Sequence, residues 1–161
     1  MKLEETLRVL YDEGVEFVII GGAAMQLQGS AYITEDLDFC YARSSKNLQR
    51  LARALKPFHP RMRNAPENLP FQFDAATLER GLNFTLSTDL GALDFLGEVS
   101  GLGNYNAVKA VSENIEVFGL DHQVLSLEGL IKAKRAAGRE KDMKAVKDLE
   151  VLLDLRKRTG L

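Results

Sequence analysis

The chain has 161 residues, of which 45% are hydrophobic and 27% are charged, and this is enough to bury the core of one ordinary globular domain. A formal net charge of −2 argues against the uniformly basic surface of an architectural nucleic-acid binder. With one cysteine, Cys40, and two histidines, the chain can form neither an intrachain disulfide nor a structural zinc site, and a reducing cytoplasm is expected.

Membrane association is not expected from the sequence. No apolar run approaches the roughly 20 residues that cross a bilayer. The first ten residues carry acidic side chains where a signal peptide has an apolar core. We therefore expect a cytoplasmic protein that does not contact a membrane.

The first third of the chain is predicted to alternate helices and strands. Leu3, Leu7 and Leu10 recur at helical spacing and Gly14 ends that helix, whereas the apolar run 15–20 is typical of a buried strand. The elements expected in order are a helix at 2–12, a strand at 15–20, the Gly21–Gly22 turn, a short helix at 23–28, a strand at 36–41 and a helix from Ser44 or Ser45 to Leu55.

All four prolines of the chain lie between residues 57 and 70, which predicts an irregular, mobile loop. The elements expected after it are strands at 83–88 and 91–99 joined by a hairpin turn, a strand near 114–120, a helix at 126–137 and a last helix whose apolar face is Met143, Val146, Leu149, Leu152 and Leu153. The predicted fold class is α+β, with a mixed sheet flanked by helices and a helical C-terminal layer. We expect a single domain at 1–161, with a core at 1–122 and C-terminal helices at 123–161 packed on it.

Three aspartates are the first candidates for chemistry. Asp36 and Asp38 stand two residues apart in a predicted strand, so their side chains are expected on one face. Asp94, in the segment Leu-Asp-Phe, is flanked by apolar residues in a later strand. If the two strands are neighbours, the three carboxylates converge on a space suited to Mg²⁺, which prefers oxygen ligands and shares its coordination with phosphates and water.

The Gly21–Gly22 turn is the second candidate. Glycine has no Cβ, so the backbone amides at the start of the following helix can approach a polyphosphate closely. A Gly-Gly turn alone is usually only a loop, and an Asp-x-Asp segment alone is usually a solvated strand. Their combination in this order is far more specific than either motif.

These motifs resemble the nucleotidyltransferase superfamily that includes DNA polymerase β, kanamycin nucleotidyltransferase and the minimal nucleotidyltransferases of prokaryotes. The matching segments are "VIIGG", "AAMQLQG", "EDLDF" and "LDF", between Val15 and Phe95. The tail "LSLEGLIKAKRAAGREKD" also resembles small nucleotidyltransferase-like proteins related to abortive-infection toxins. The chain departs from those relatives at Tyr32, where they often carry an arginine two residues before the threonine of Thr-x-Asp-x-Asp.

The resemblance implies transfer of a nucleoside monophosphate from a nucleoside triphosphate (NTP) to a hydroxyl, with Mg²⁺ or Mn²⁺ as cofactor. It implies that Asp36, Asp38 and Asp94 are catalytic and bind metal. The residues implied to bind the nucleotide are Gly21, Gly22, Thr34, Lys132 and Asp142; Thr34 is equally compatible with a purely structural role. We expect the ammonium of Lys132 to face the carboxylates, with Lys134 outside the cleft.

The acceptor and the partners stay open at this stage. A tRNA, a protein hydroxyl or a small molecule is compatible with the resemblance, as is a role in a toxin–antitoxin pair. The alternative function is a non-catalytic nucleotide-binding or toxin–antitoxin interaction module with the same fold. Lys46, Arg50 and Arg53 form a basic stripe on one predicted helix, which is either a solvated face or a patch for tRNA or an acidic protein partner.

Overall fold

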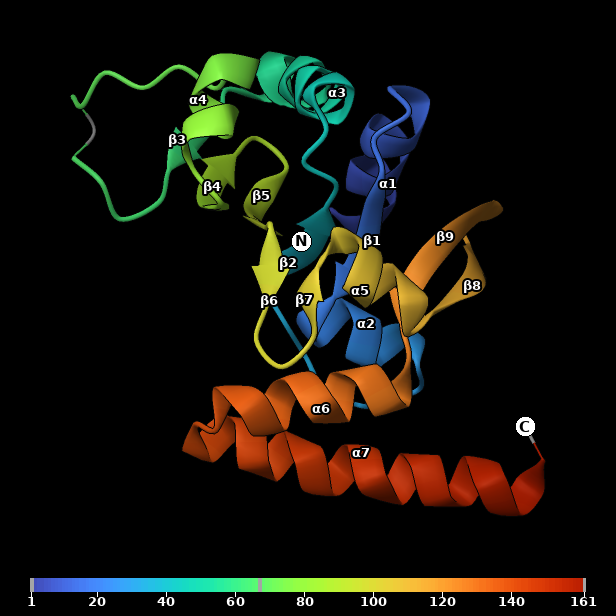
Figure 1. Ribbon diagram of the computed structural model, residues 1–161. Helices are drawn as coiled ribbons and strands as arrows, with labels where there is room; N and C mark the ends of the chain where they lie inside the picture. Colours follow the sequence, from blue (N-terminus) through green and yellow to red (C-terminus); the bar gives the residue numbers. More distant parts are fainter. Residues whose placement is uncertain (1, 67, 161) are drawn as a thin grey trace.

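The computed structural model describes residues 2–66 and 68–160, and its first half follows the predicted order of helices and strands (Figure 1). The elements up to the proline-rich stretch are α1 (Leu3–Asp12), β1 (Phe17–Ile20), α2 (Gly21–Leu27), β2 (Leu37–Tyr41), α3 (Ser45–Leu55) and the short 3-10 helix η1 (Lys56–Phe58). Helix α3 begins where its cap predicts, because the Ser44 hydroxyl accepts a hydrogen bond from the Asn47 amide at 3.2 Å.

The second half contains more elements than the sequence predicted. They are β3 (Arg61–Met62), α4 (Ala75–Arg80), β4 (Asn83–Thr88), β5 (Gly91–Leu96), β6 (Glu98–Val99), β7 (Gly103–Asn104), α5 (Tyr105–Ala110), β8 (Ser112–Val117), β9 (Leu120–Leu125), α6 (Leu127–Ala137) and α7 (Glu140–Thr159). The hairpin of β4 and β5 is confirmed, with Thr88 paired to Gly91. The proline-rich stretch is not wholly irregular, since it contains β3, which pairs with β4.

Seven strands form one mixed sheet in the order β3-β4-β5-β2-β1-β9-β8. Strands β2 and β5 are parallel, as are β1 and β9, and the other neighbouring pairs are antiparallel. The α+β prediction with a mixed sheet is therefore confirmed. Strand β9 was not predicted. It pairs with both β1 and β8 and directly precedes α6.

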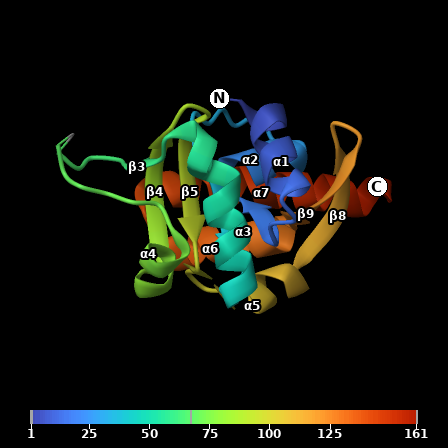
Figure 2. The same cartoon turned by 90° about the horizontal axis from the view of Figure 1, so that it is seen from above.

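Helices cover both faces of the sheet. Viewed from above, α3 crosses one side of the strands while α6 and α7 lie on the far side (Figure 2). Phe39 stacks on Phe95 with ring centroids 5.2 Å apart and meets Phe17 edge to face at 5.4 Å, so the central strands share an aromatic core. Alternation along β2 then directs Asp38 to the opposite face from Phe39.

Helices α6 and α7 run side by side as an antiparallel layer below the sheet (Figure 1). The Ser126 hydroxyl caps α6 by accepting a hydrogen bond from the Gly129 amide at 3.1 Å, as its position predicts. On α7, Val146 and Leu149 are buried, but Met143 is 43% exposed and does not belong to the packed face. Within the described part of the chain, no helix is both long enough and apolar enough to cross a membrane.

Candidate active site

Two of the three predicted carboxylates meet on adjacent strands. Asp38 on β2 and Asp94 on β5 are direct partners in the parallel register, so they project from the same face at the same level of the sheet. Both side chains are partly buried. The strand order that makes β2 and β5 neighbours is therefore what assembles this pair.

The environment of Asp38 is unfavourable for a negative charge. The pKa of Asp38 is raised from 3.8 to about 7, chiefly by burial and then by the neighbouring Asp94 and Asp36 carboxylates. The ammonium of Lys134 acts in the opposite direction and lowers it. A positive charge next to Asp38 would relieve both the repulsion and the lost hydration.

The sequence predicted that Asp36 and Asp38 lie on one strand. In the structure, Asp36 lies outside that strand. Strand β2 begins at Leu37, and Asp36 is an exposed residue in the bend before it. The bend has a local cause: the Thr34 hydroxyl donates to the Asp36 carbonyl at 2.9 Å and accepts from the Asp36 amide at 3.3 Å. No group of three or more histidine, cysteine or acidic side chains is arranged to hold a metal ion in residues 2–66 and 68–160, so the expected convergence of three carboxylates is not seen.

Gly21 and Gly22 are the first residues of α2, where the sequence predicted a turn before a helix at 23–28, and Gly21 packs directly on Asp38. A Cβ on Gly21 would lie 2.2 Å from Asp38 Oδ2, and the φ angle of +62° at Gly21 is one that other residues rarely adopt. A Cβ on Gly22 would lie 2.6 Å from the Cβ of Thr34 and 2.9 Å from the ring of Tyr32. Both glycines are therefore required by close approach, and Thr34 contributes to the wall of this turn.

Lys132 lies elsewhere than predicted, and Lys134 takes its expected position. Lys132 is exposed on the outer side of α6 and lines a hollow with Glu128, Ile131, Arg135, Glu150 and Leu153. Lys134 is partly buried, and its charge reaches Asp38. The reason is helical geometry: Lys134 follows the buried Leu130 by four residues and continues its face, whereas Lys132 does not.

Asp142 is buried at the start of α7 and holds two cations near the carboxylate pair. Its carboxylate accepts from Arg139 Nε at 2.7 Å and from the Arg139 amide at 3.2 Å, and Lys134 Nζ lies 3.5 Å away. These bonds to Arg139 lower the pKa of Asp142, while Asp142, Tyr32 and Asp38 raise the pKa of Arg139. Asp142 therefore serves to position Lys134 and Arg139, and both oxygens of its carboxylate already have cationic partners.

Arg63 is a site residue that the sequence analysis missed. It follows β3, and its guanidinium forms an ion pair with Asp94 while donating to the Leu86 carbonyl at 3.2 Å. Its main-chain amide also donates to the Thr85 carbonyl at 2.9 Å. The proline-rich stretch thus contributes a cation to the site, and the pairing of β3 with β4 keeps that cation in place.

The predicted basic stripe lies on α3, across the sheet from α6 and α7 (Figure 2). Arg50 donates to the Gly14 carbonyl at 3.3 Å, Arg53 lies 3.7 Å from Glu13, and Lys46 is exposed. Two of the three side chains therefore contact the turn between α1 and β1. This geometry favours a local packing role, and a tRNA or protein partner at the stripe stays a prediction.

The family model described as "Nucleotidyl transferase of unknown function (DUF2204)" matches residues 1–50, which contain the Gly-Gly turn and the Asp-x-Asp segment. Solved structures match almost the whole chain. The chain has the nucleotidyltransferase fold. None of the curated proteins matches the sequence.

Three solved structures illustrate the similarity. The lincosamide antibiotic adenylyltransferase LnuA, bound to lincomycin, is 16% identical with a TM-score of 0.59, covering 94% of this chain and 96% of its own. ANT(2")-Ia in complex with adenylyl-2"-tobramycin is 12% identical with a TM-score of 0.55, covering 99% and 97%. A nucleotidyltransferase-like protein from Paracoccidioides brasiliensis is 15% identical with a TM-score of 0.55, covering 96% and 75%. The fold implied by the motif resemblance is confirmed, and the family model agrees with it over the segment that carries the Gly-Gly and Asp-x-Asp motifs.

Proposed function

We propose that the protein is a divalent-metal-dependent nucleotidyltransferase that moves a nucleoside monophosphate from an NTP to a hydroxyl acceptor. One observation carries the proposal: the Asp38–Asp94 pair abuts the Gly21 turn and is faced by the cations of Lys134 and Arg139. A carboxylate pair opposite an organised pair of cations matches a metal–triphosphate complex, which carries charges of both signs.

The carboxylate pair fits a hard divalent cation. Mg²⁺ is usually held by one or two carboxylates, with substrate phosphates and water completing its shell. Asp38 and Asp94 supply two carboxylates, and repulsion between them raises the pKa of Asp38, which a cation would reverse. We therefore assign Asp38 and Asp94 as the metal-binding residues, with Asp36 close enough to add charge. When bound, Mg²⁺ or Mn²⁺ would neutralise charge on the transferred phosphoryl group and the leaving oxygens.

The triphosphate would lie between the Gly21–Gly22 turn and the cations of the C-terminal layer. Gly21, which is only partly buried at the start of α2, would offer its backbone amide to a phosphate, and Lys134 supplies a compact charge suited to a phosphate. Arg139 provides a guanidinium near Tyr32, the position at which resembling proteins carry an arginine. We propose that this arginine from α7 compensates for the departure at Tyr32.

The reaction would be an in-line displacement at the α-phosphorus. The acceptor oxygen forms the new P–O bond, the bond from the α-phosphorus to the bridging oxygen breaks, and pyrophosphate leaves. Asp94 is the candidate to accept the hydroxyl proton once Arg63 releases it, since it is partly buried beside Asp38. Lys134 and Arg139 would stabilise the charge that develops on the leaving group.

The acceptor class is open within this proposal. LnuA and ANT(2")-Ia are described with lincomycin and adenylyl-tobramycin, so small-molecule acceptors occur on this fold. A tRNA or protein acceptor, and a role in a toxin–antitoxin pair, stay predictions from the motif resemblance. The cytoplasm remains the expected compartment.

The test is to incubate the purified protein with each α-labelled NTP, Mg²⁺ or Mn²⁺, and a cell extract separated into small molecules, RNA and protein. The proposal expects label in one fraction, release of pyrophosphate, and no transfer with EDTA or with the variant Asp38→Asn. Absence of label in every fraction, together with absence of metal-dependent NTP binding, would refute it.

A second candidate is a nucleotide-binding module without turnover. The Arg63–Asp94 ion pair favours it, because Asp94 is neutralised by the protein itself and is then not free to bind metal or accept a proton. Metal-dependent NTP binding without pyrophosphate release in any fraction of the extract would support this candidate.

A further inference from the structure

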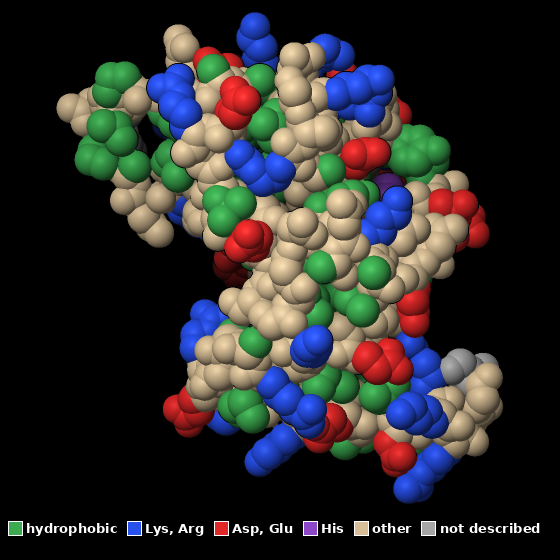
Figure 3. Space-filling view, in the orientation of Figure 1, with side chains coloured by type: hydrophobic (Ala, Val, Ile, Leu, Met, Phe, Trp, Pro, Cys, Tyr) green, Lys and Arg blue, Asp and Glu red, His purple; other side chains and the backbone are tan. Residues whose placement is uncertain are grey.

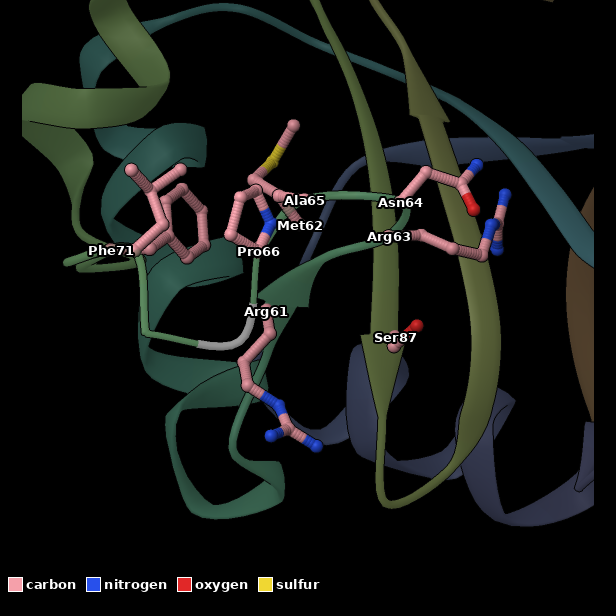
Figure 4. Close-up of a pocket in the computed structure, with 9 residues that line it drawn as sticks. Arg61, Met62, Arg63, Asn64, Ala65, Pro66, Phe71 and Ser87 are labelled. Atoms are coloured by element: carbon pink, nitrogen blue, oxygen red, sulfur yellow. The ribbon is translucent and has the colours of Figure 1, made fainter.

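A cavity of about 270 Å³ opens beside the candidate site, between the edge of the sheet at β3–β4 and the proline-rich stretch (Figure 4). Its described lining residues are Arg61, Met62, Arg63, Asn64, Ala65, Pro66, Leu69, Phe71 and Ser87. Ligand pockets of drug size usually measure about 300–1,000 Å³, so this cavity suits one ring with its substituents and is too small for a nucleotide.

The cavity has an apolar side and a polar side. Phe71, Pro66 and Met62 gather on one side, while Arg63 and Asn64 extend the other way, over β4 and β5 (Figure 4). Two arginines, Arg61 and Arg63, belong to the lining, and none of its described residues is acidic. A molecule with an apolar or aromatic body and an anionic group matches both sides, whereas a cationic molecule would be repelled by the arginines.

Arg63 connects the cavity to the chemistry. Arg63 lines the cavity, and its side chain extends from there over the strands to pair with Asp94, while its main-chain amide and its guanidinium donate to the β4 carbonyls of Thr85 and Leu86. A ligand whose anionic group binds Arg63 would therefore lie next to Asp94. It would also compete with Asp94 for the guanidinium and so leave that carboxylate free.

We propose that this cavity is the acceptor subsite and that it selects a small organic anion carrying a hydroxyl. The acceptor role rests on the proposed nucleotidyl transfer, whereas the binding of an anion does not. The anionic group pairs with Arg63, Arg61 adds positive charge at another side of the cavity, and the ring packs on Phe71. The acceptor hydroxyl attacks the α-phosphorus of the NTP, its proton passes to the freed Asp94 carboxylate, and pyrophosphate leaves.

Three probes of similar size, one anionic, one neutral and one cationic, test the selectivity: 4-(hydroxymethyl)benzoate, 4-(hydroxymethyl)benzamide and 4-(hydroxymethyl)benzamidine. Their affinities are measured by titration of backbone amide NMR signals, without nucleotide, and the shifts also locate the site. We expect the benzoate to bind at least tenfold more tightly than the cationic probe, with shifts at the amides of lining residues such as Arg63, Phe71 and Ser87.

Two variants separate the cavity from general surface charge. Arg61→Ala should weaken benzoate binding several-fold and should not weaken benzamidine binding, because one positive charge is removed from the cavity. The matched control is Lys147→Ala, which removes one exposed cation from α7 and should change neither affinity. Arg61 is exposed on the edge strand, so the fold of the variant is expected to persist, and this is checked by its NMR spectrum.

Equal or tighter binding of the benzamidine, shifts outside the cavity, or an equal loss with Lys147→Ala would overturn the inference. A short single-stranded RNA is added as a competitor; displacement of the benzoate by this RNA at a much lower concentration would also overturn it, in favour of a nucleic-acid acceptor. Metal-dependent ATP binding is measured separately by calorimetry. If the protein selects the anionic probe but does not bind ATP with metal, the proposed function is refuted. If it binds ATP with metal but does not select the anionic probe, the acceptor subsite is refuted.

Discussion

The two halves of the candidate site organise charge in opposite ways. On the sheet, Asp38 and Asp94 are brought together by strand register, and burial with repulsion raises the pKa of Asp38 to about 7. In the C-terminal layer, Asp142 is surrounded by Arg139 and Lys134, and hydrogen bonding lowers its pKa. The space-filling view shows basic side chains over α6 and α7, below the waist that separates this layer from the sheet (Figure 3).

The comparison teaches which half needs a ligand. The negative charges of Asp38 and Asp94 are only partly balanced, by the ion pair of Arg63 with Asp94 and by the charge of Lys134 acting on Asp38. A further cation would therefore stabilise them. In the C-terminal layer, Asp142 already has its cationic partners, and the charges of those partners, Lys134 and Arg139, act on Asp38. A metal–nucleotide complex fits this arrangement because it places a cation against the sheet and anionic phosphates against the helices.

The largest effect is expected from Asp38→Asn, which keeps the shape of the side chain but removes its charge. We expect nucleotidyl transfer to fall about a thousandfold, because several kcal/mol of charge stabilisation through the metal is lost. Pyrophosphate release with saturating NTP and Mg²⁺ measures it, and Glu98→Gln, an exposed change, is the control. Full activity in the Asp38→Asn variant would mean that the sheet half is not catalytic.

Gly21→Ala tests whether the turn must approach the carboxylate. The new Cβ would overlap Asp38 Oδ2 and would also require a φ angle near +62°. We expect the free energy of unfolding to fall by about 2–4 kcal/mol, combining backbone strain with displacement of the carboxylate. The matched control is Gly119→Ala, which has a φ angle of +80° but nothing within 4 Å of its Cβ, so it isolates the backbone term of about 1 kcal/mol. Equal losses in the two variants, measured by urea denaturation, would show that close approach is unimportant.

Asp142→Asn tests the opposite half. We expect the free energy of unfolding to fall by about 1–3 kcal/mol, because a buried carboxylate with two cationic partners is lost while the largely exposed Arg139 moderates the effect. Asp154→Asn breaks an exposed pair with Arg158 on the same helix and should cost less than about 0.5 kcal/mol. An unfolding free energy that rises in Asp142→Asn would contradict the contrast between the two halves.

Without metal, the two halves of the site should change the free energy of unfolding in opposite directions as the pH rises, because the pKa of Asp38 is raised and that of Asp142 is lowered. The pKa of Asp38 is raised when the protein folds, so its favourable contribution is complete below about pH 3.8 and is lost as the pH rises to about 7. From pH 4.5 to pH 8, wild type should therefore lose on the order of 1–2 kcal/mol relative to Asp38→Asn in denaturant titrations. Parallel curves for the two proteins would show that Asp38 is not strained by its neighbours.

The smallest effect concerns the two lysines of α6. Lys134→Ala should weaken metal-dependent ATP binding about tenfold, because one charge-assisted phosphate contact is removed. Lys132→Ala is the matched control on the same helix and should leave the Kd for ATP unchanged, since its ammonium is exposed on the other face. Calorimetric titration measures both, and a larger loss with Lys132→Ala would restore the placement expected from the sequence alone.

Much of the fold could be predicted because local signals agree with the tertiary structure. The caps at Ser44 and Ser126, the strand run ending at Ile20 and the β4–β5 hairpin are encoded by a few neighbouring residues each. The elements that were missed are short or polar, as with β3, or alternate weakly, as with β9. Such strands depend on pairing with distant partners, so their own residues carry little signal.

By itself, the sequence determined which chemical groups the site contains: the two glycines, the Asp-x-Asp segment and a later aspartate between apolar residues. Only the tertiary structure decided which of them meet. Strand order makes Asp38 and Asp94 partners, a bend closed by Thr34 separates Asp36 from the strand, and helical phase selects Lys134 over Lys132. The pairing of β3 with β4 delivers Arg63 to Asp94. The physical reason is that side-chain type is local, whereas register, helix rotation and strand neighbours are set by packing of the whole core.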